Sequence, residues 1–419
     1  MVVIHLRASW FRVAAWVMRF LLALLVLLTP SLALAQAERR LLTASEARAL
    51  DAGEYGKQFG VAQDEAERRL RAQDELVPAT DALQAEFAPR WAGLWIEHTP
   101  AFRVVVQLVG DTPVTPRFVP VGGMTVPVLF KTGAPVTRVT VLAAIATRQA
   151  ALRAALPHPP GLAADPRSAS LLVLLNSADE YLIGPELVER LSAIAGVPVR
   201  LTGAAGAVDA AALPGGRLVG LGPGDSLRHL CTAGFAVTDG HRDAIATAAH
   251  CPDEVSSEDG AVPEPLPFIL QDGWSFRDVQ LNASPVPLSP VFASDRDKQL
   301  LRPVAGVRPA RSVRVGDWVC HRGERSGYSC AVVRFTDFAP AGDLCGGPCA
   351  PRWVMVAGPG CRNGDSGGPV FSGTTALGLL KGASFGAGGV CNFYMYMPLD
   401  ALPDGWRVKL QSDEALQRE

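Results

Sequence analysis

The stretch Gly364-Asp365-Ser366-Gly367-Gly368-Pro369-Val370 decides the fold of this chain when it is taken together with Thr247-Ala248-Ala249-His250-Cys251, far upstream. A serine on a glycine-rich turn offers a hydroxyl nucleophile, and a histidine offers the base that activates it. The run around Ser366 also fits the G-x-S-x-G elbow of other hydrolases, in which the acid and the histidine follow the serine. All seven histidines precede Ser366, so that arrangement is excluded and the base comes from upstream.

The third catalytic group should be a carboxylate between His250 and Ser366, buried against the imidazole at the end of a strand. Asp278 fits this requirement best, because apolar residues at positions 276, 279 and 281 flank it. Other aspartates of this region lie in polar loops or turn-like sequence: Asp253, Asp259, Asp272, Asp295, Asp297, Asp317 and Asp343. We therefore predict a triad of His250, Asp278 and Ser366.

A further stretch, Val319-Cys320-His321-Arg322-Gly323 followed by Gly327-Tyr328-Ser329-Cys330, has the form of a small disulfide loop. With the serine and histidine stretches, it resembles the chymotrypsin-like serine proteases, and among them the secreted bacterial group of alpha-lytic protease and the streptogrisins. The resemblance covers roughly Cys231 to Pro398, a region of ordinary domain size. It implies an all-β double Greek-key β-barrel protease domain.

The resemblance also implies how these residues act. His250 takes the proton of Ser366 during attack on an acyl carbon, and Asp278 holds the imidazole in its tautomer. The backbone amides of Gly364 and Ser366 form the oxyanion hole. Asp365 has two interpretations: it holds the oxyanion loop, with Arg322 as its cationic partner, or it is a solvated turn residue.

The cysteines indicate an oxidising compartment, because their number is even and all eight lie in the protease region. The resemblance implies the pairs Cys231 with Cys251, Cys320 with Cys330 and Cys361 with Cys391, which leaves Cys345 with Cys349. A zinc site built from Cys345, Cys349 and Cys361 is disfavoured, because no suitably spaced histidine accompanies them. We expect no metal and no cofactor.

The resemblance places the walls of the substrate pocket at Gly358-Pro359-Gly360 and Lys381-Gly382-Ala383. No acidic residue stands at the expected pocket base, which predicts an apolar rather than a basic P1 side chain. Residues 393–396, Phe-Tyr-Met-Tyr, supply candidate apolar lining, although half of an alternating strand faces the core.

Two pocket residues depart from the family pattern. Lys381 stands where the family has a serine that supports the buried aspartate, and Ala383 stands where it has glycine. The lysine either pairs with Asp278 or points to solvent, and the sequence leaves both open. These departures keep a second class of function in view, a secreted pseudoprotease that binds protein without cleaving it.

The first 35 residues read as a signal peptide. Arg7, Arg12 and Arg19 precede the apolar run Phe20–Leu28, and Ala33-Leu34-Ala35 forms a small-residue cleavage site. The apolar run is too short for a comfortable membrane span, and an uncleaved anchor is the alternative. A secreted or periplasmic protein is expected, without a stable membrane span.

Residues 36–203 are predicted to form an α+β pro-region without cysteine. Its expected elements are helix across residues 36–88 with a capping box at Thr43 and Glu46, strands at 95–98, 102–106, 136–142, 169–175 and 197–201, and helices to 156 and at 185–195. An Ala/Gly/Pro-rich linker with the processing site follows at 204–224, then the protease domain at 225–405 and a tail at 406–419.

The stretch from Gly93 to His98, leading into Phe102–Val106, is similar to part of the pro-region of alpha-lytic protease relatives. This implies a segment that assists folding and then inhibits the enzyme. A permanent accessory domain is the alternative.

The composition, 48% hydrophobic with a net charge of −2, argues against nucleic-acid or anionic-membrane partners. We predict a monomeric, secreted serine endopeptidase made as a proenzyme, whose partners are a polypeptide substrate and its own pro-region. An exported esterase using the same triad is a further alternative.

Overall fold

The structure of the protein is a computed structural model that describes residues 39–204, 208–209, 216–221, 228–259, 263–342, 344–358, 360–385 and 390–416. The predicted signal peptide and most of the predicted linker lie outside these residues. Within the described ranges, no helix is both long enough and apolar enough to cross a membrane.

The N-terminal part opens with three helices, α2 (Ala44–Phe59), α3 (Gln63–Glu75) and α4 (Val77–Glu86), where the sequence predicted continuous helix. The capping box is confirmed: Thr43 accepts the Glu46 amide, and Glu46 accepts the Thr43 amide. Gly60 ends α2 with a positive φ of 67°, a conformation that glycine adopts without strain. The helical prediction was therefore right in type and wrong in continuity.

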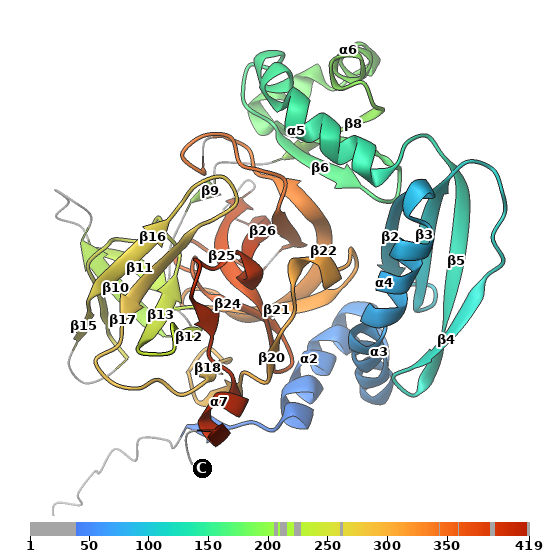
Figure 1. The fold of residues 1–419 in the computed structure, drawn as a ribbon. Coiled ribbons are helices and arrows are strands. Elements are labelled where there is room, and N and C mark those ends of the chain that lie inside the picture. Colours follow the sequence, from blue (N-terminus) through green and yellow to red (C-terminus); the bar gives the residue numbers. More distant parts are fainter. Residues whose placement is uncertain are drawn as a thin grey trace, which may run out of the picture. The chain divides into compact units, whose positions relative to one another are not determined.

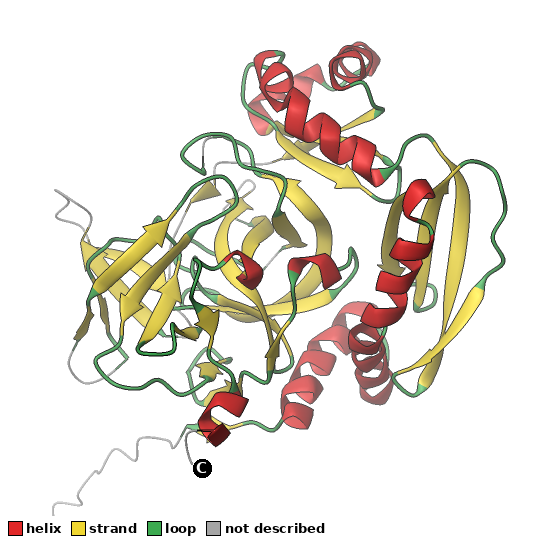
Figure 2. Cartoon of the chain, in the orientation of Figure 1, coloured by secondary structure: helices red, strands yellow, loops and turns green. Residues whose placement is uncertain are grey.

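Two α/β layers follow (Figures 1 and 2). In the first, α3 and α4 pack on a sheet of order β2-β3-β5-β4. In the second, α5 (Arg138–Ala154) and α6 (Pro185–Ala195) pack on β6, β7 and β8. The strands are β2 (Trp91–Glu97), β3 (Arg103–Val109), β4 (Arg117–Val121), β5 (Met124–Ala134), β6 (Gly161–Asp165), β7 (Ser170–Asn176) and β8 (Val199–Ala204).

The strand predicted at 136–142 is wrong. Those residues lead into α5, because the Thr137 hydroxyl caps it by accepting the Thr140 amide at 3.3 Å. Val141 then turns inward to the core that α5 forms with the sheet. The capping contact and the burial of one helix face outweigh the strand preference of the valines and threonines.

A closed barrel of six strands forms the C-terminal half of the predicted protease region (Figure 1). Its order is β21-β24-β25-β26-β23-β22, and the pairing of β21 with β22 closes it. The strands are β21 (Trp318–Gly323), β22 (Gly327–Ala339), β23 (Trp353–Ala357), β24 (Pro369–Ser372), β25 (Thr375–Phe385) and β26 (Cys391–Pro398). The main hydrophobic core fills this barrel and continues under the neighbouring sheets.

The other half of the protease region consists of two antiparallel sheets, β11-β10-β14-β15 and β16-β17-β13-β12-β27. Their strands are β10 (Arg217–Leu221), β11 (Arg228–Thr232), β12 (Ala236–Thr238), β13 (Asp243–Thr247), β14 (Val255–Ser257), β15 (Glu264–Leu266), β16 (Phe268–Asp272), β17 (Val279–Ala283) and β27 (Arg407–Val408). Short elements complete the fold: β1 (Arg40–Leu41), β18 (Val291–Ala293), β19 (Leu300–Pro303), β20 (Gly306–Val307) and α7 (Gln411–Leu416).

Two predicted boundaries change. Residues 217–221 form a strand with Leu218 fully buried, so they belong to the protease sheets and not to the linker. The predicted tail also packs, because β27 pairs with β12 through Val237 and Val408. Burial of apolar residues on these short strands outweighs the loop-like composition around them.

Strand pairing also joins the N-terminal layers to the barrel. β22 pairs with β6, with Phe338 opposite Ala163. A short strand, β9 (Val208–Asp209), pairs antiparallel with β25, so that Asp209 lies opposite Ala383. The first part of the predicted linker therefore adds a strand to the edge that carries the predicted pocket residues.

Candidate active site

His250 and Asp278 meet because their strands are neighbours. His250 follows β13 and Asp278 precedes β17, and these strands pair antiparallel with Thr247 opposite Gln280. His250 Nδ1 lies 2.8 Å from Asp278 Oδ2 and 3.1 Å from Oδ1. The backbone amide of His250 also donates to Asp278 Oδ1 at 3.3 Å. The carboxylate therefore fixes both the ring and the backbone of the histidine.

Asp278 is a buried carboxylate that stays ionised. It is 2% exposed, and burial alone would raise its pKa. His250 and Lys381 beside it outweigh burial and lower the pKa to about 2. Asp278 therefore accepts hydrogen bonds as an anion throughout the neutral range.

Ser366 lies in the loop before β24, and its side chain is 2% exposed. Its hydroxyl donates to the backbone carbonyl of Lys381 at 2.7 Å, and its own carbonyl accepts the Thr232 amide at 3.1 Å. Gly367 has a φ of 81°, and a Cβ there would come within 2.9 Å of the Ala248 amide nitrogen. The serine loop thus lies directly against the loop that carries His250.

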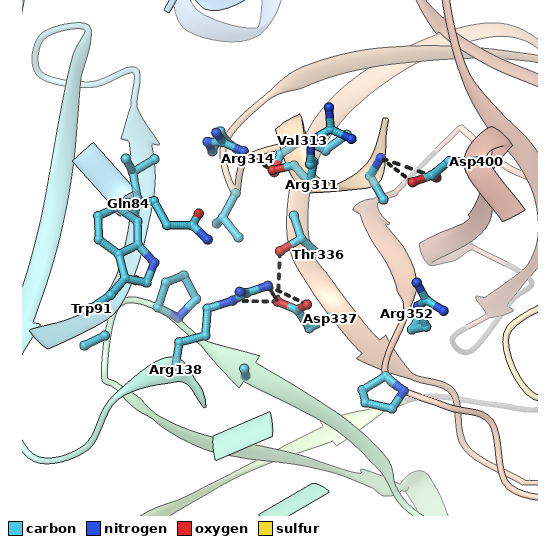
Figure 3. Close-up of a pocket in the computed structure, with 18 residues that line it drawn as sticks. Gln84, Trp91, Arg138, Arg311, Val313, Arg314, Thr336, Asp337, Arg352 and Asp400 are labelled. Atoms are coloured by element: carbon cyan, nitrogen blue, oxygen red, sulfur yellow. Dashed lines mark hydrogen bonds and ion pairs between the residues drawn. The ribbon is translucent and has the colours of Figure 1, made fainter. Parts of the chain in front are cut away.

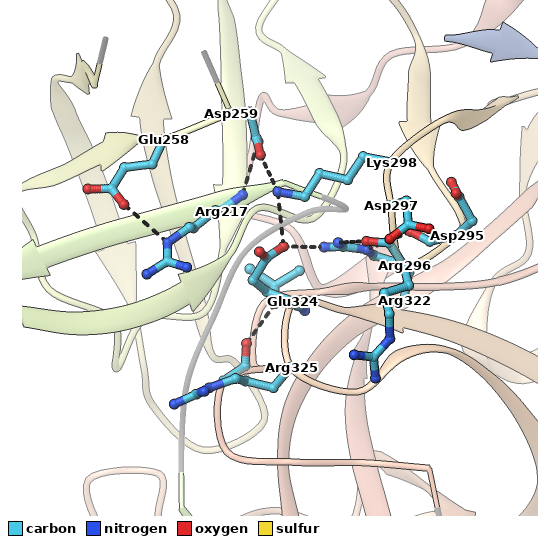
Figure 4. A network of polar contacts seen from close by, with 12 residues as sticks. Arg217, Glu258, Asp259, Asp295, Arg296, Asp297, Lys298, Arg322, Glu324 and Arg325 are labelled. Carbon is cyan, nitrogen blue, oxygen red and sulfur yellow. Dashed lines mark hydrogen bonds and ion pairs between the residues drawn. The ribbon is translucent and has the colours of Figure 1, made fainter. Parts of the chain in front are cut away.

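Asp365 holds the serine loop through backbone amides. Its Oδ1 accepts the amides of Arg325 and Ser326, each at 3.0 Å, and its Oδ2 accepts the Arg362 amide at 2.6 Å. The proposed partner Arg322 is wrong, because that guanidinium pairs with Glu324 at 2.9 Å. Glu324 lies two residues from Arg322 on the same hairpin, much nearer in the chain than Asp365. The Glu324 carboxylate also pairs with the Lys298 ammonium at 3.2 Å (Figure 4).

Gly364, just before Asp365, has a φ of 115° that only glycine adopts readily. A Cβ at this position would lie 2.0 Å from Cγ of Arg325. The glycine therefore lets the loop approach the hairpin that supplies amides to Asp365. Neither this contact nor the amide partners Arg325 and Ser326 of Asp365 could be read from the sequence, because they come from a hairpin that is distant in the chain.

Lys381 points inward rather than to solvent. Its side chain is 4% exposed, and its Nζ lies 3.3 Å from Asp278 Oδ2. The ammonium also lies 4.9 Å from the centre of the Trp353 ring, a cation–π contact. Of the two alternatives left open by the sequence, the structure has the pairing with Asp278.

The predicted pocket residues are closely packed. A Cβ on Gly360 would lie 1.8 Å from Ser329 Oγ, so this glycine permits a contact between two loops. Gly382 and Ala383 lie on β25 opposite Met395 and Tyr394. Pro359 falls outside the described residues.

Of the candidate lining, Tyr394, Met395 and Tyr396 are buried in the core, and only Phe393 is partly exposed. Phe393 lines a cavity of about 550 Å³ together with Met355 and Leu174. No residue of the predicted triad lines that cavity. Of residues 393–396, three therefore belong to the core, and Phe393 belongs to a cavity away from the predicted triad.

A second cavity, of about 410 Å³, also lies away from the triad. It is lined by Trp91, Val313 and the ion pair of Arg138 with Asp337, whose closest atoms are 2.5 Å apart (Figure 3). The Asp337 carboxylate also accepts the Thr336 hydroxyl at 3.2 Å.

His321 is a buried histidine that the sequence marked only as part of the small disulfide loop. It is fully buried, and its ring centre lies 4.6 Å from that of Tyr394. Burial lowers the pKa of His321 to about 4, so the ring is neutral at neutral pH. Its position on β21 opposite β24 could not be read from local sequence.

The structure contains four disulfides: Cys231–Cys251, Cys320–Cys330, Cys345–Cys349 and Cys361–Cys391. The first joins β11 to the residue after His250, and the last joins the serine loop to β26. Two of the cross-links thus hold the loops of the predicted triad.

Known proteins share part of this chain. It is 28% identical to streptogrisin-C of Streptomyces griseus over 179 residues, which is 40% of this chain and 36% of that protein. The chain thus spans about a third of the length of this curated relative. No family model matches the chain.

Solved structures with a similar fold include a Nocardiopsis protease (NAPase), with 21% identity and a TM-score of 0.38, covering 48% of this chain and all of that one. Protease A of Thermobifida fusca has 21% identity and a TM-score of 0.35, with the same coverage. The alpha-lytic protease homolog N4 has 20% identity and a TM-score of 0.32, covering 45% of this chain and 94% of its own.

The chain is similar in sequence to streptogrisin-C over 179 residues, and it contains a closed six-stranded barrel; both findings support the resemblance to the chymotrypsin-like serine proteases. The predicted fold class is confirmed: a mostly β protease region follows an N-terminal part that contains helices.

Proposed function

We propose that this chain is the precursor of a secreted serine endopeptidase that cleaves peptide bonds through Ser366, His250 and Asp278. The observation that carries the proposal is the buried Asp278 carboxylate, which orients His250 Nδ1 at 2.8 Å beside a loop that presents Ser366. A buried anion is costly, and its burial is offset here by these contacts to the histidine and to Lys381.

In the proposed reaction, Ser366 Oγ attacks the peptide carbonyl while His250 Nε2 takes its proton. The hydroxyl leaves its hydrogen bond to the Lys381 carbonyl and turns to the imidazole. The imidazolium, stabilised by Asp278, then protonates the leaving amine as the acyl-enzyme forms. Water, activated by the same histidine, hydrolyses the acyl-enzyme and regenerates Ser366.

The amides of Gly364 and Ser366 are the proposed oxyanion hole. The support for this assignment is the positive φ of Gly364 and the anchoring of Asp365 by three backbone amides. Together they fix the loop before substrate arrives, and a donor fixed in advance needs no reorganisation when charge develops.

An apolar P1 side chain is the proposed preference, in a pocket walled by Gly360, Lys381, Gly382 and Ala383. The only charged side chain among these residues is Lys381, whose ammonium is turned away to Asp278. No carboxylate belongs to this set, so a basic P1 residue would find no partner there. Ala383 brings a methyl group where the resembled family has glycine, which favours smaller side chains.

The N-terminal part is proposed to be a pro-region that blocks the enzyme before processing. β9 pairs antiparallel with β25 at Ala383 and Ser384. Lys381, two residues before Ala383 on the same strand, contacts both Ser366 and Asp278. An extended strand on this edge occupies the place where a substrate backbone would pair. Processing is proposed in the segment between Asp209 and Gly216, which joins this strand to the protease sheets.

Export is part of the same proposal. The four disulfides belong to an oxidising compartment, and the N-terminal sequence supplies a signal-peptide pattern. Secretion into the medium or the periplasm satisfies both features.

The proposal is tested by Ser366→Ala, with Ser372→Ala on β24 as a matched control. The first variant should lose peptide hydrolysis by roughly a million-fold and should accumulate as unprocessed precursor, whereas the control should do neither. Peptide hydrolysis and amino-terminal sequencing of the secreted product measure both effects. Processing of Ser366→Ala at the wild-type rate would contradict self-cleavage, and hydrolysis at the wild-type rate would contradict the nucleophile.

A secreted pseudoprotease is the second candidate. The contact of Lys381 with Asp278 favours it, because a cation at the triad acid weakens the support that this acid gives to a histidine cation. The two candidates differ in whether Ser366 reacts.

A further inference from the structure

We infer that Lys381 is a positioning residue that extends the action of His250 as a base to lower pH, by offsetting the charge of Asp278. The inference rests on the proposed function, since it concerns the proton affinity of the proposed base. It assigns a role to a residue that the resembled family does not have at this position.

The geometry places one carboxylate oxygen between an imidazole and an ammonium group. Asp278 Oδ2 lies 2.8 Å from His250 Nδ1 and 3.3 Å from Lys381 Nζ. The lysine is held there on its other side by the Trp353 ring, at 4.9 Å from the ammonium. Burial of both side chains, 4% exposed for Lys381 and 2% for Asp278, keeps water from screening the pair.

Few other charges reach this carboxylate. The guanidinium of Arg277, the residue before Asp278, pairs with the Asp272 carboxylate at 2.8 Å. On β26, the contact is with the uncharged Met397, whose sulfur accepts the Asp278 amide at 3.3 Å. On the serine loop, Asp365 is fully engaged by three backbone amides.

On the histidine loop, Asp253 is exposed and accepts Gln271. Among the described residues, His250 and Lys381 are thus the charged or titratable groups in contact with Asp278.

The consequence follows from the sign of the charges. A carboxylate with no other cation beside it favours the protonated form of a neighbouring imidazole. Such a histidine keeps its proton up to a higher pH and works as a base only above that pH. A cation on the same oxygen offsets that field, so His250 releases its proton at lower pH. The same offset weakens the stabilisation of the imidazolium that forms during attack. The activity gained at acidic pH is therefore accompanied by slower turnover at neutral pH.

A second buried lysine offers a matched control. Lys409 is also 4% exposed and pairs with Asp243, in the same protease region but at the far end of β13 from His250. Lys409→Met removes a comparable buried pair without touching Asp278. Any effect of stability alone should therefore appear in both lysine variants.

The test is the pH profile of kcat/KM for Lys381→Met, Lys381→Gln, Lys381→Arg and Lys409→Met. Removal of the charge in the Met and Gln variants should shift the acid limb of the kcat/KM profile to higher pH by about one unit. At the pH where the wild type is half active, each neutral variant should then retain about a tenth of its own plateau, about fivefold less than the fraction that the wild type retains. Lys381→Arg should restore the wild-type limb, and Lys409→Met should leave it in place.

A titration of His250 by NMR in the Ser366→Ala protein gives a readout that needs no hydrolysis. Its midpoint should rise when Lys381 is replaced by Met or Gln, and not when Lys409 is replaced by Met. An unmoved midpoint in a folded neutral variant overturns the inference. A raised midpoint, together with a failure of the protein that keeps Ser366 to hydrolyse peptides, leaves the inference standing and overturns the proposed function instead.

Discussion

Asp278 is contacted by His250 and Lys381 at one oxygen, and its ionisation links the proposed triad to stability in acid. Folding lowers its pKa from 3.8 to about 2, because His250 and Lys381 outweigh its burial. A lowered pKa gives stability that is present above about pH 4 and is lost as the pH falls towards 2.

We predict that Asp278→Asn flattens the acid limb of stability. In the inactive Ser366→Ala background, the free energy of unfolding should fall by about 2 kcal/mol less between about pH 5 and about pH 2 when Asp278 is Asn. Urea unfolding at several pH values measures this difference. Asp253→Asn, at an exposed loop carboxylate, is the control, and equal slopes in all three proteins would refute the account.

At the scale of single residues, the sequence predicts which side chains meet but not how each is held. The serine and histidine follow from their flanking residues, and Asp278 follows from its apolar neighbours. The orientation of Lys381 depends on Trp353, which comes from a distant strand, so the local sequence left it open. Asp365 binds backbone amides, which residues of almost any type supply, so no sequence pattern identifies its partners.

At the scale of elements, helix α2 contributes a buried charge to the barrel. Asp51 is 2% exposed and lies 2.8 Å from Arg302 on β19, which is fully buried. Asp51 also accepts the Tyr328 hydroxyl at 2.6 Å and the Gly373 amide at 2.7 Å. Removal of the carboxylate therefore leaves a buried guanidinium without its ionic partner.

We predict that Asp51→Ala in the Ser366→Ala precursor lowers the free energy of unfolding by about 3–5 kcal/mol. Glu54→Ala, which removes a more exposed pair with Lys57 on the same helix, should cost less than about 1 kcal/mol. Urea unfolding compares the two. Equal losses would show that the Asp51 contact contributes nothing beyond a surface pair.

The elements themselves were predictable where the pattern was local. Helix α6 was predicted at 185–195 and is found at Pro185–Ala195, because proline begins it and Gly196 ends it. The hairpin of β4 and β5 was missed, since Phe118 and its neighbours are exposed and give no burial pattern. The strand predicted at 136–142 was wrong, because the Thr137 cap and the buried face of α5 favour a helix in that segment.

At the scale of the whole molecule, carboxylates of the N-terminal helices meet arginines of the protease region. Asp51 pairs with Arg302, and Asp74 and Asp81 pair with Arg308 and Arg314. Several strand pairs in the protease region, such as β12 with β27 and β20 with β25, join distant parts of the chain, and such pairings form slowly. A segment that holds several of these strands in place would therefore assist folding.

We predict that residues 216–419 made without residues 36–215 fail to reach the native fold, because these arginines lose their partners. Near-ultraviolet circular dichroism of the refolded protein measures the loss, and addition of residues 36–215 as a separate chain should restore the signal. The intact Ser366→Ala precursor is the control. A native signal from the shorter chain alone would contradict a folding role and favour a permanent accessory domain.

The division of the chain into parts was predictable only in outline. The cysteines and the triad residues mark the protease region, whereas β10 and β27 lie where composition predicted linker and tail. Their partners, β11, β14 and β12, lie elsewhere in the chain, so only the assembled sheets reveal them.

Ser366 is the proposed nucleophile, activated by His250, and a fluorophosphonate probe reports on that reactivity without a peptide substrate. We predict that the processed wild-type protein is labelled on Ser366, as located by mass spectrometry of its peptides. His250→Ala should abolish the label, and Ser372→Ala should keep it. A folded, processed protein without label on Ser366 would contradict the claim and leave a protease fold that binds without cutting.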